Sequence, residues 1–587
     1  MARPLIIGNC SGFFGDRLAA AREMVTGGPI DVLTGDWLAE LTMLILAKAR
    51  SRTPGAGYAS TFLKQMGDVL EECLDRGIRI VSNAGGLNPA GLAQAIADLA
   101  AERGRTPKIA YVTGDDVLEA LPGMLASGAA RPFPNSPEID PDKVVSANAY
   151  IGGWGVVEAL RAGADVVITG RTTDAALVCA PAAWWHDWAR DDWDRLAGAV
   201  VAGHVIECGT QATGGNYSFF TEVADMRRIG FPWAEIHEDG SAVIGKHPGT
   251  GGVVNRETVL SQLLYEIGSP LYLGPDVDAR FDTLAVTELD TDRVRVSGAV
   301  GQAPSGLLKT SINMIGGYRN DLSVALVGLD IERKAELLTE LFWDACPYTP
   351  EDYDAVDVRV QRTDVEDPDT SERATATWSI TLKSTRPELV GRRASGALVE
   401  LALASIPGFY LLSGPPSEGR EFGVHASALV PLAAAHQTVH LFGGAEIDVA
   451  DLDVTERDAQ FAPEVAAAEE TEPITGDTRR VPLGQLVGSR SGDKGGAANL
   501  GLYVRDPRVW PWLDAHLTTE RLRELIPEAA DLAVDRHRLP NLHSLNFVIH
   551  GFLGDGVAAS TRIDAQAKSL GEWIRARAVD VPVALLD

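Results

Sequence analysis

Short apolar runs at residues 5–7, 30–33, 78–82, 109–113 and 166–169 alternate with longer segments of helical periodicity. This alternation is typical of βαβ units, which require a parallel sheet covered by helices. Each apolar run ends in a loop rich in Gly, Asn, Asp or Ser. Because ligands of open α/β sheets collect at the carboxyl ends of the strands, these loops are the first place to look for functional residues.

Four segments are expected along the chain. Residues 1–255 predict an α/β domain with glycine-rich strand-end loops, and residues 256–450 predict an α+β portion packed on it. Residues 451–480 are dense in Glu, Ala, Asp and Thr and predict an acidic linker. Residues 481–587 predict a separate small α+β domain. The fold class is therefore α/β with a large parallel sheet. Helices are predicted at residues 16–25, 37–50, 62–75, 89–102, 154–162, 510–525 and 564–577.

Charge and hydrophobicity exclude several classes of protein. The 587 residues include 52 Lys and Arg against 81 Asp and Glu, a net charge of −29. This excess repels nucleic-acid phosphates and anionic lipids, so we expect neither a nucleic-acid nor a membrane role. The chain has 45% hydrophobic residues, as a packed globular protein does. Five scattered cysteines without CxxC spacing, and no apolar run of about 18 residues, predict a soluble protein of the reducing cytoplasm.

Polar side chains follow the predicted strands at the point where each strand ends. Asp36 and Glu40 follow the second strand, and Arg171 and Asp174 follow the strand at 166–169. Since these ends share one edge of the sheet, we expect the three carboxylates to serve as acid, base or cation-binding groups beside the guanidinium. The other loop residues expected to contact a substrate are Asn9, Ser11, Gly12, Asp16, Arg17, Asn83 and Asn88. For the aspartates and asparagines the alternative is a helix N-cap.

Residues 203–216 pack polar groups and glycines between apolar runs without periodicity. One interpretation makes Cys208 a nucleophile with His204 as its base. Another makes the cysteine a small buried apolar group. A third makes this segment a loop that hydrogen-bonds a substrate carbonyl or phosphate. The residues expected to do so are Thr210, Gln211, Gly214, Gly215 and Asn216.

A third cluster lies in the C-terminal domain, where Ser, Arg, Lys and glycines crowd into residues 488–496. We expect an anion-binding loop, because this is a basic stretch in an acidic protein. The residues expected to bind the anion are Ser489, Arg490, Ser491, Asp493, Lys494 and Gly495. The alternative is a tight β-hairpin that needs glycine for its turn.

Lysines and histidines elsewhere give weaker signals. Lys246 and Lys309 lie in polar segments and could steady an enolate, although most lysines are solvated. His436 and His440 stand four residues apart without the glutamate of a zinc-binding helix, and the segment could equally extend a strand. No metal site is assigned.

Taken in order, the motifs resemble the acyclic terpene utilisation proteins of the AtuA type. The matching stretches are SGFFGDR at 11–17, GIRIVSNAGG at 77–86, AYIGG at 149–153, GRTTDAA at 170–176, ECGTQATGGN at 207–216 and RSGDKGG at 490–496. The last resembles part of the family's appended ferredoxin-like domain. The resemblance implies a bacterial-type catabolic protein encoded with acyl-CoA carboxylases and enoyl-CoA hydratases that degrade branched acyclic acids, such as those from citronellol or geraniol. It implies no reaction and assigns no catalytic residue.

Three functions are consistent with these observations. The leading hypothesis is an enzyme acting on a branched acyl or acyl-CoA substrate by hydratase, lyase or isomerase chemistry, with a CoA thioester as substrate. The second is a non-catalytic partner of an acyl-CoA carboxylase. The third is a ligase that uses Mg²⁺ and a nucleotide, for which the chain lacks a recognisable triphosphate loop. We also expect a homo-oligomer, and association with an acyl-CoA carboxylase or an enoyl-CoA hydratase.

Overall fold

The computed structural model describes residues 3–134, 136–412, 418–458 and 476–586. The chain forms two compact units. Unit 1 comprises Met1–Asn313, His425–Val557 and Gln566–Asp587, and unit 2 comprises Met314–Val424 and Ala558–Ala565. All residues predicted for the functional site belong to unit 1. Within the predicted linker, residues 459–475 lie outside the described residues.

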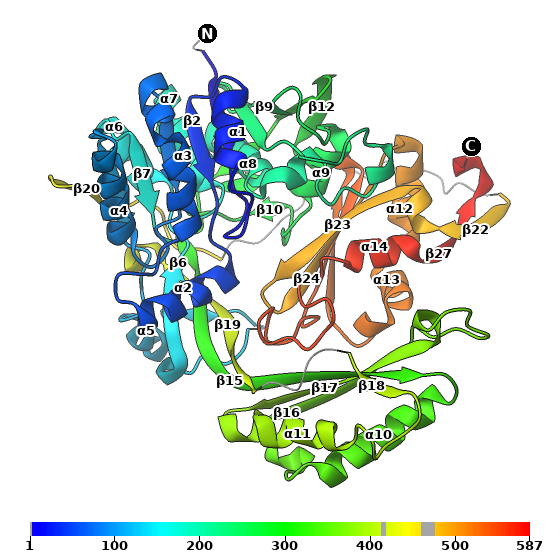
Figure 1. Ribbon diagram of the computed structural model, residues 1–587. Coiled ribbons are helices and arrows are strands. Elements are labelled where there is room, and N and C mark those ends of the chain that lie inside the picture. The colour runs from blue at the N-terminus through cyan, green and yellow to red at the C-terminus, as the bar shows by residue number, and fades with distance from the viewer. Residues whose placement is uncertain (1–2, 135, 413–417, 459–475, 587) are drawn as a thin grey trace. The chain divides into compact units, whose positions relative to one another are not determined.

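An eleven-stranded sheet forms the centre of unit 1, in the order β12-β13-β9-β8-β1-β2-β3-β7-β4-β20-β21 (Figure 1). Its five middle strands, from β1 to β4 in that order, are parallel. The predicted parallel α/β sheet is therefore confirmed. Antiparallel strands extend it at both edges. The strands are β1 (Leu5–Asn9), β2 (Val32–Gly35), β3 (Arg79–Ser82), β4 (Ile109–Thr113), β7 (Val166–Thr169), β8 (Pro232–Ile236), β9 (Ala242–Lys246), β12 (Ala285–Asp290), β13 (Arg293–Ser297), β20 (Thr438–Leu441) and β21 (Glu446–Asp448).

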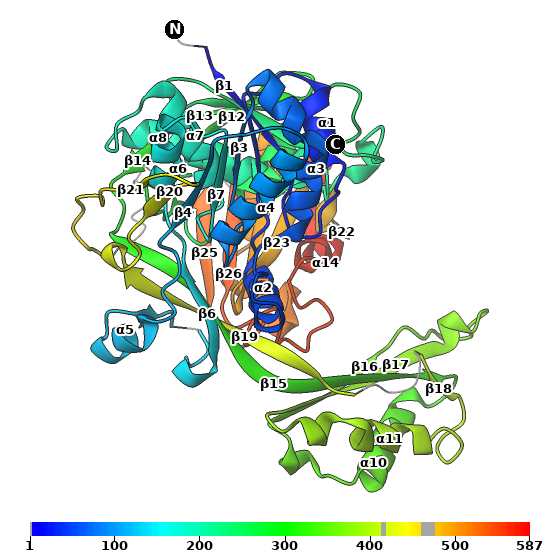
Figure 2. The same ribbon diagram turned by 60° about the vertical axis from the view of Figure 1, so that its left-hand side comes forward.

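Helices cover both faces of this sheet. Helices α1 (Ala20–Gly27), α3 (Ser60–Arg76) and α4 (Pro89–Glu102) share one apolar cluster with the parallel strands. Helices α7 (Ala176–His186) and α8 (Trp193–Ile206) pack on the opposite face (Figure 2). Because both faces are covered, the parallel strands are nearly continuous apolar runs. The remaining helices of this part are α2 (Glu40–Arg52), α5 (Leu121–Ser127), α6 (Trp154–Arg161) and α9 (Arg256–Leu263).

The carboxyl ends of the parallel strands lie at one edge of the sheet. In the pairing register, Asn9 of β1 stands opposite Thr34 of β2, and Gly35 stands opposite Ser82 of β3. Ser82 in turn stands opposite Ile168 of β7. The loops that follow these strands therefore lie side by side, as the sequence predicts.

The C-terminal residues form a small antiparallel domain within unit 1. Its sheet has the order β23-β24-β26-β25 and its own apolar core. The predicted helix over residues 510–525 is two helices, because Leu517 leaves the helical conformation and Thr518 caps the second one. The elements are β22 (Thr478–Pro482), β23 (Val487–Lys494), β24 (Ala497–Val504), α12 (Trp510–His516), α13 (Thr519–Leu525), β25 (Val534–Leu539), β26 (Ser544–Ile549), α14 (Leu570–Ala576) and β27 (Ala578–Pro582).

Two long strands run from unit 1 into unit 2. They are β15 (Leu307–Val327) and β19 (Arg420–Pro431). Unit 2 also holds β16 (Ala355–Gln361), β17 (Thr375–Ser384), β18 (Phe409–Leu411), α10 (Ile331–Ala345) and α11 (Arg392–Glu400). The short strands of unit 1 are β5 (Arg131–Pro132), β6 (Val144–Ala149), β10 (Leu271–Tyr272), β11 (Asp278–Arg280) and β14 (Val300–Gln302). None of the helices in the described ranges has the length and apolar character needed to cross a bilayer.

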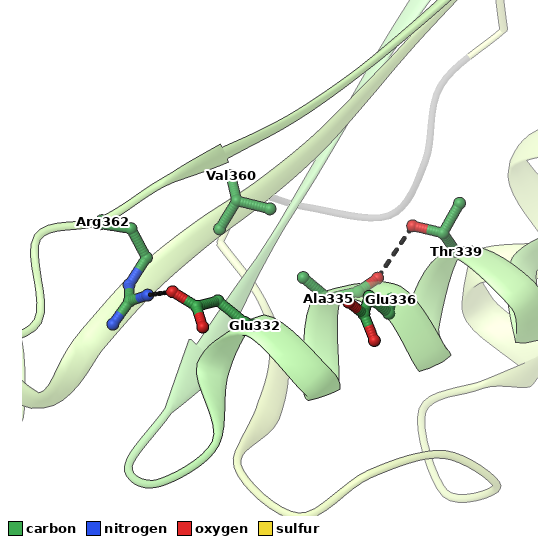
Figure 3. Close-up of a pocket in the computed structure, with 6 residues that line it drawn as sticks. All are labelled: Glu332, Ala335, Glu336, Thr339, Val360 and Arg362. Carbon is green, nitrogen blue, oxygen red and sulfur yellow. Dashed lines mark hydrogen bonds and ion pairs between the residues drawn. The ribbon is translucent and has the colours of Figure 1, made fainter.

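Unit 2 carries a shallow hollow of about 330 Å³ between α10 and β16 (Figure 3). Glu332 and Arg362 form an ion pair of 2.7 Å in its lining, and the Thr339 hydroxyl donates to the Ala335 carbonyl. Both charged side chains are largely exposed to solvent. Solvent screens an ion pair this exposed, so the pair contributes little free energy.

Candidate functional site

Asp36 lies at the end of β2 in a buried hydrogen-bonded turn. Its Oδ1 atom accepts hydrogen bonds from Asn83 Nδ2 at 2.5 Å and from the Leu38 amide at 2.8 Å. Asn83 Oδ1 accepts from the Trp37 amide at 3.0 Å, so this side chain ties the end of β3 to the end of β2. Burial, and next the charge of Asp174, raise the pKa of Asp36 well above its usual value. Asp36 therefore holds its proton more firmly than an ordinary aspartate.

Arg171 brings a permanent positive charge to the same edge. Its guanidinium is 3% exposed, lies 2.8 Å from Asp174 Oδ1 and donates to the Leu38 carbonyl. The guanidinium also stacks on Tyr150, 3.9 Å from the ring centroid. Its backbone amide donates to Asp115 at 2.8 Å, which fixes the turn after β7. Arg171, Asp36 and Asp174 thus lie together as predicted.

Glu40 meets two residues that sequence reasoning did not join to it. Its Oε1 accepts a hydrogen bond from Lys309 Nζ at 2.8 Å, and its Oε2 lies 3.4 Å from His425 Nδ1. His425 Nε2 lies 3.1 Å from Ser311 Oγ. Lys309 and Ser311 are alternate residues of β15, so they share a face, and His425 belongs to β19. Strands β15 and β19 therefore contribute to the strand-end site.

The charges around Glu40 keep it ionised. Burial pushes the pKa of Glu40 upward, but His425 and then Lys309 lower it by more, well below the usual range. Burial lowers the pKa of Lys309, yet Glu40 more than reverses this effect. Solvent reaches this part of the site, because Glu40, Asp174 and Lys309 keep 20, 26 and 30% of their side-chain surface exposed. The accessible Glu40 and the buried Asp36 thus both act on the charge of one guanidinium, that of Arg171.

A buried pair, Glu207 and His204, borders the loop after β1. Asn9 Nδ2 donates to the Glu207 carbonyl at 3.3 Å, and Glu207 Oε1 lies 3.3 Å from His204 Nδ1. Glu207 Oε2 has no hydrogen-bond partner among the described residues. Burial, and next Asp174, raise the pKa of Glu207 well above its usual value, whereas burial lowers the pKa of His204 to about 4. The pair therefore favours the neutral form of both groups.

Cys208 and His204 do not form a nucleophile and base pair. The side chain of His204 approaches Glu207 instead. Burial, and next Glu207, raise the pKa of the Cys208 thiol well above its usual value, so a thiolate is disfavoured. The backbone here packs tightly, since a Cβ on Gly12 would lie 2.5 Å from the Cys208 carbonyl carbon. Gly12 serves this close approach between two loops.

The amides of Gly214 and Gly215 are engaged within their own loop. Both donate to the Thr210 carbonyl, because residues 209–213 form a 3₁₀ turn that closes on itself. Gln211 Oε1 accepts from Asn216 Nδ2 at 3.4 Å. This loop shapes the site through its own hydrogen bonds.

Four further predicted binding residues make structural contacts. Asp16 accepts hydrogen bonds from the amides of Gly12 and Arg17 at 2.9 and 2.8 Å, and α1 begins only at Ala20. Arg17 forms an ion pair of 2.7 Å with Glu23. Asn88 is the N-cap of α4 and accepts from the Gly91 amide at 2.9 Å. Ser11 Oγ donates to the Phe13 carbonyl of its own loop. Each of these polar groups therefore has a partner within the protein.

The predicted anion loop of the C-terminal domain is the β23–β24 hairpin, and most of its polar groups are engaged. The Ser489 backbone amide donates to Ser218 Oγ at 3.0 Å, and Ser491 Oγ accepts from the Gly571 amide at 2.9 Å. Lys494 Nζ donates to the Glu266 carbonyl at 3.0 Å. These residues join the hairpin to the rest of unit 1. Gly495 occupies the turn with φ +61° and adds no ligand group.

Titratable groups near this hairpin have shifted pKa values or lie within ion-pair distance of one another. Burial, and next the charge of Lys309, lower the pKa of Lys494 to about 8. Burial, and next Glu266, raise the pKa of Asp493 to about 7. Lys568 lies 3.4 Å from Glu266 and 3.6 Å from Asp493. The charges of Lys309 and Glu207 thus act on Lys494 of the C-terminal domain.

Glu40 and Asp174 pair with Lys309 and Arg171, whereas Asp36 is hydrogen-bonded to Asn83 and Glu207 lies beside His204. Within the described ranges, no group of three or more His, Cys, Asp and Glu side chains is arranged to hold a metal ion. His436 and His440 lie apart from the site: the first contacts Asp448 and the second contacts Glu446. Lys246, the second lysine considered, pairs with Asp292 at 2.9 Å.

Comparison with known families places both parts of the chain. The model of the acyclic terpene utilisation family protein AtuA matches residues 5–441, and the model of the AtuA ferredoxin-like domain matches residues 481–580. The first match includes Asp36, Lys309 and His425, and the second includes the β23–β24 hairpin. A search of curated proteins finds no match. The chain therefore belongs to the acyclic terpene utilisation family AtuA and carries that family's ferredoxin-like domain.

Proposed function

We propose that this protein is an enzyme that acts on a branched acyclic acyl or acyl-CoA substrate by acid–base chemistry, in a hydration, lyase or isomerisation step of acyclic terpene or branched-acid degradation. Membership of the family supports the metabolic context. The observation that carries the chemistry is the grouping of the proton-holding Asp36, the accessible Asp174 and the ionised Glu40 around the guanidinium of Arg171 at one sheet edge. Asp36 can supply an acid there, and the accessible carboxylate of Asp174 can supply a base.

Each group has a role in the proposed chemistry. Asp174 is the candidate base, since its carboxylate is accessible and lies beside Arg171. It removes a proton next to the thioester carbonyl, and the resulting enolate oxygen gains negative charge. Lys309 and Arg171 stabilise that charge from the same edge. Asp36 donates a proton to the substrate. Asp174 then gives its proton to solvent and Asp36 regains one from solvent, which returns both groups to their starting states.

The test offers a panel of branched acyl-CoAs to the full chain in deuterated water. Mass spectrometry then measures both deuterium uptake at the carbon next to the carbonyl and any product. We expect Asp174→Asn and Asp36→Asn to lose uptake and turnover. Asp165→Asn is the matched control, because Asp165 precedes β7 at the opposite end of that strand and pairs with Arg79.

The outcomes separate the proposed enzyme from the other two hypotheses. Unchanged activity in both site variants overturns the assignment of acid and base. No chemical change to any thioester, together with co-purification of an acyl-CoA carboxylase subunit, favours the non-catalytic partner. Turnover that requires ATP and Mg²⁺ favours the ligase.

A further inference from the structure

Arg490 has a buried guanidinium that forms no ion pair with the carboxylates of the described residues. The residue is 7% exposed, and its Nη1 donates to the Asn216 carbonyl at 3.3 Å. Its Nε and Nη2 atoms have no hydrogen-bond partner in the described part of the chain. Removing a charged group from water costs several kcal/mol unless a partner compensates for it. The free edge of Arg490 therefore calls for a ligand.

The other deeply buried arginine shows what such a partner does. Arg171 is 3% exposed and lies 2.8 Å from the carboxylate of Asp174. Burial lowers the pKa of Arg490, whereas carboxylates raise the pKa of Arg171 against the effect of burial. The difference is the missing carboxylate at Arg490.

The surroundings of Arg490 are suited to a negative group. Its guanidinium lies 4.8 Å from the centroid of the Tyr265 ring, and Lys568 Nζ lies 4.6 Å from the same centroid. The nearby carboxylates of Glu266 and Asp493 are both within ion-pair distance of Lys568. Two cations therefore share one aromatic ring in a protein of net charge −29. An anion that reaches Arg490 also meets the positive charge of Lys568 beside the same ring.

We propose that the Nε and Nη2 edge of Arg490 binds a planar oxyanion of the ligand, a carboxylate or a phosphate, side-on through two parallel hydrogen bonds. Nε–H and one Nη2–H point the same way from the guanidinium plane, which matches the spacing of two oxygens on one carboxylate or phosphate. The edge is screened from water, so a ligand must displace the side chains that cover it, and the ion pair then forms in a low dielectric.

The inference rests on the proposed function in one respect, since the anion is taken to belong to the substrate. It is a free carboxylate on the acyl chain or a phosphate of CoA. The hairpin that carries Arg490 contacts the loop of residues 207–216 through Asn216, and Glu207 of that loop reaches the strand-end site. A substrate anchored at Arg490 would thus stand next to the residues proposed for catalysis.

The test is calorimetric titration of the full chain with inorganic phosphate, acetate, succinate, free CoA and pantetheine. We expect at least one anion to bind. Binding should weaken at least tenfold in Arg490→Gln and in Arg490→Lys, since lysine keeps the charge but loses the paired donors. Arg256→Lys is the matched control: Arg256 also donates to a backbone carbonyl of the C-terminal domain, that of Leu542 at 3.1 Å.

The probes separate the two sources of the oxyanion. Binding of CoA and phosphate but not of pantetheine identifies a phosphate, whereas binding of acetate or succinate identifies a carboxylate. The inference is overturned if the wild type binds none of these anions. It is also overturned if Arg490→Lys, with an unchanged thermal midpoint, binds them as tightly as the wild type. Because no turnover is measured, anion binding by a protein that converts no thioester would contradict the proposed function and leave this inference standing.

Discussion

Three carboxylic acids at the strand-end site differ in proton affinity because their neighbours differ. Burial raises the pKa of Asp36 and Glu207, and Asp174 adds to the effect in both. The pKa of Glu40 is lowered instead, because the charges of His425 and Lys309 outweigh the effect of burial. Residue type alone would make all three alike at neutral pH. Local charge therefore divides one kind of side chain between proton-holding and ionised roles.

The raised pKa of Glu207 makes a prediction for Glu207→Gln. In the unfolded chain the pKa of a glutamate is about 4.3. The folded protein binds the proton more tightly, so this group's contribution to stability falls as pH rises from that value through the folded pKa. Glutamine has no charge and escapes this loss. The thermal midpoint of Glu207→Gln should therefore rise relative to wild type between pH 5 and pH 8.

Thermal unfolding across that pH range checks the prediction. Glu119→Gln, at an exposed side chain, is the control. A difference between Glu207→Gln and wild type that does not change with pH would show that the folded protein does not hold this proton.

The ion pair between Glu40 and Lys309 predicts a coupling energy. Lys309→Met leaves Glu40 without its closest cation, and Glu40→Gln leaves the ammonium without its acceptor at 2.8 Å. Each single change should lower the free energy of unfolding by about 1–3 kcal/mol. The double variant should lose less than the sum of both. Urea unfolding of the four proteins measures the cycle, and additive losses would contradict a direct interaction.

At the scale of elements, the C-terminal sheet receives another segment of unit 1 directly on its strands. Asn499 Oδ1 accepts from the Glu266 amide at 2.7 Å, and Asn546 Nδ2 donates to the Gly268 carbonyl at 2.5 Å. Both asparagines are fully buried. Their pairing with backbone groups satisfies polar atoms that would otherwise be costly at a buried contact. Residues 264–268 therefore meet the sheet through satisfied hydrogen bonds, next to helix α9, whose Ser261 donates to Tyr503 of β24.

Glycine at this contact predicts the result of adding a methyl group. A Cβ on Gly501 of β24 would lie 2.4 Å from the Leu264 Cβ, too close for real atoms. Gly501→Ala should therefore cost about 1–3 kcal/mol of stability through overpacking. Gly123 of α5 has open space around it, so Gly123→Ala should be neutral or slightly stabilising. Denaturant unfolding compares the two, and equal stabilities would show that the contact is loose.

Elements with strong local signals could be predicted from the sequence. Helix α4 begins and ends as predicted, because Asn88 caps it and Pro89 opens it. Strand β7 is also predicted to the residue, as a short buried apolar run. Helix α1 starts later than predicted, since the side chain of Asp16 bonds to its own loop instead of capping a helix. Local pattern does not reveal which of several hydrogen bonds an aspartate makes.

The candidate site was predictable only where its residues follow parallel strands. Asp36, Arg171 and Asp174 share an edge because βαβ units bring strand ends together. Lys309 is 269 positions from Glu40, and no periodicity relates β15 to the loop after β2. The same holds for His425 on β19. Their place in the site comes from tertiary packing, which a single sequence does not encode in any short motif.

At the scale of the whole molecule, hydrogen bonds join the C-terminal domain to the rest of unit 1. Ser489 and Ser218 exchange hydrogen bonds at 3.0 Å in both directions. Asn541 Nδ2 donates to the Phe281 and Leu284 carbonyls. The C-terminal chain also supplies Ala558–Ala565 to unit 2. Apart from Ala558–Ala565, the family's ferredoxin-like domain therefore belongs to unit 1.

This integration predicts how a divided protein behaves. We divide the protein into two chains, residues 1–458 and residues 476–587, and produce them together. They should co-purify and unfold in one cooperative transition, because either chain alone would have buried polar groups without their partners. Size-exclusion chromatography and calorimetry measure both properties. Asn546→Ala removes the hydrogen bond to the Gly268 carbonyl and should weaken the association, whereas Arg480→Ala, at an exposed side chain of β22, should not. Two separate unfolding transitions would instead mean that the domain is held mainly by its covalent connection. In that case the hydrogen bonds of Lys494 and the placement of Arg490 would depend on the intact chain.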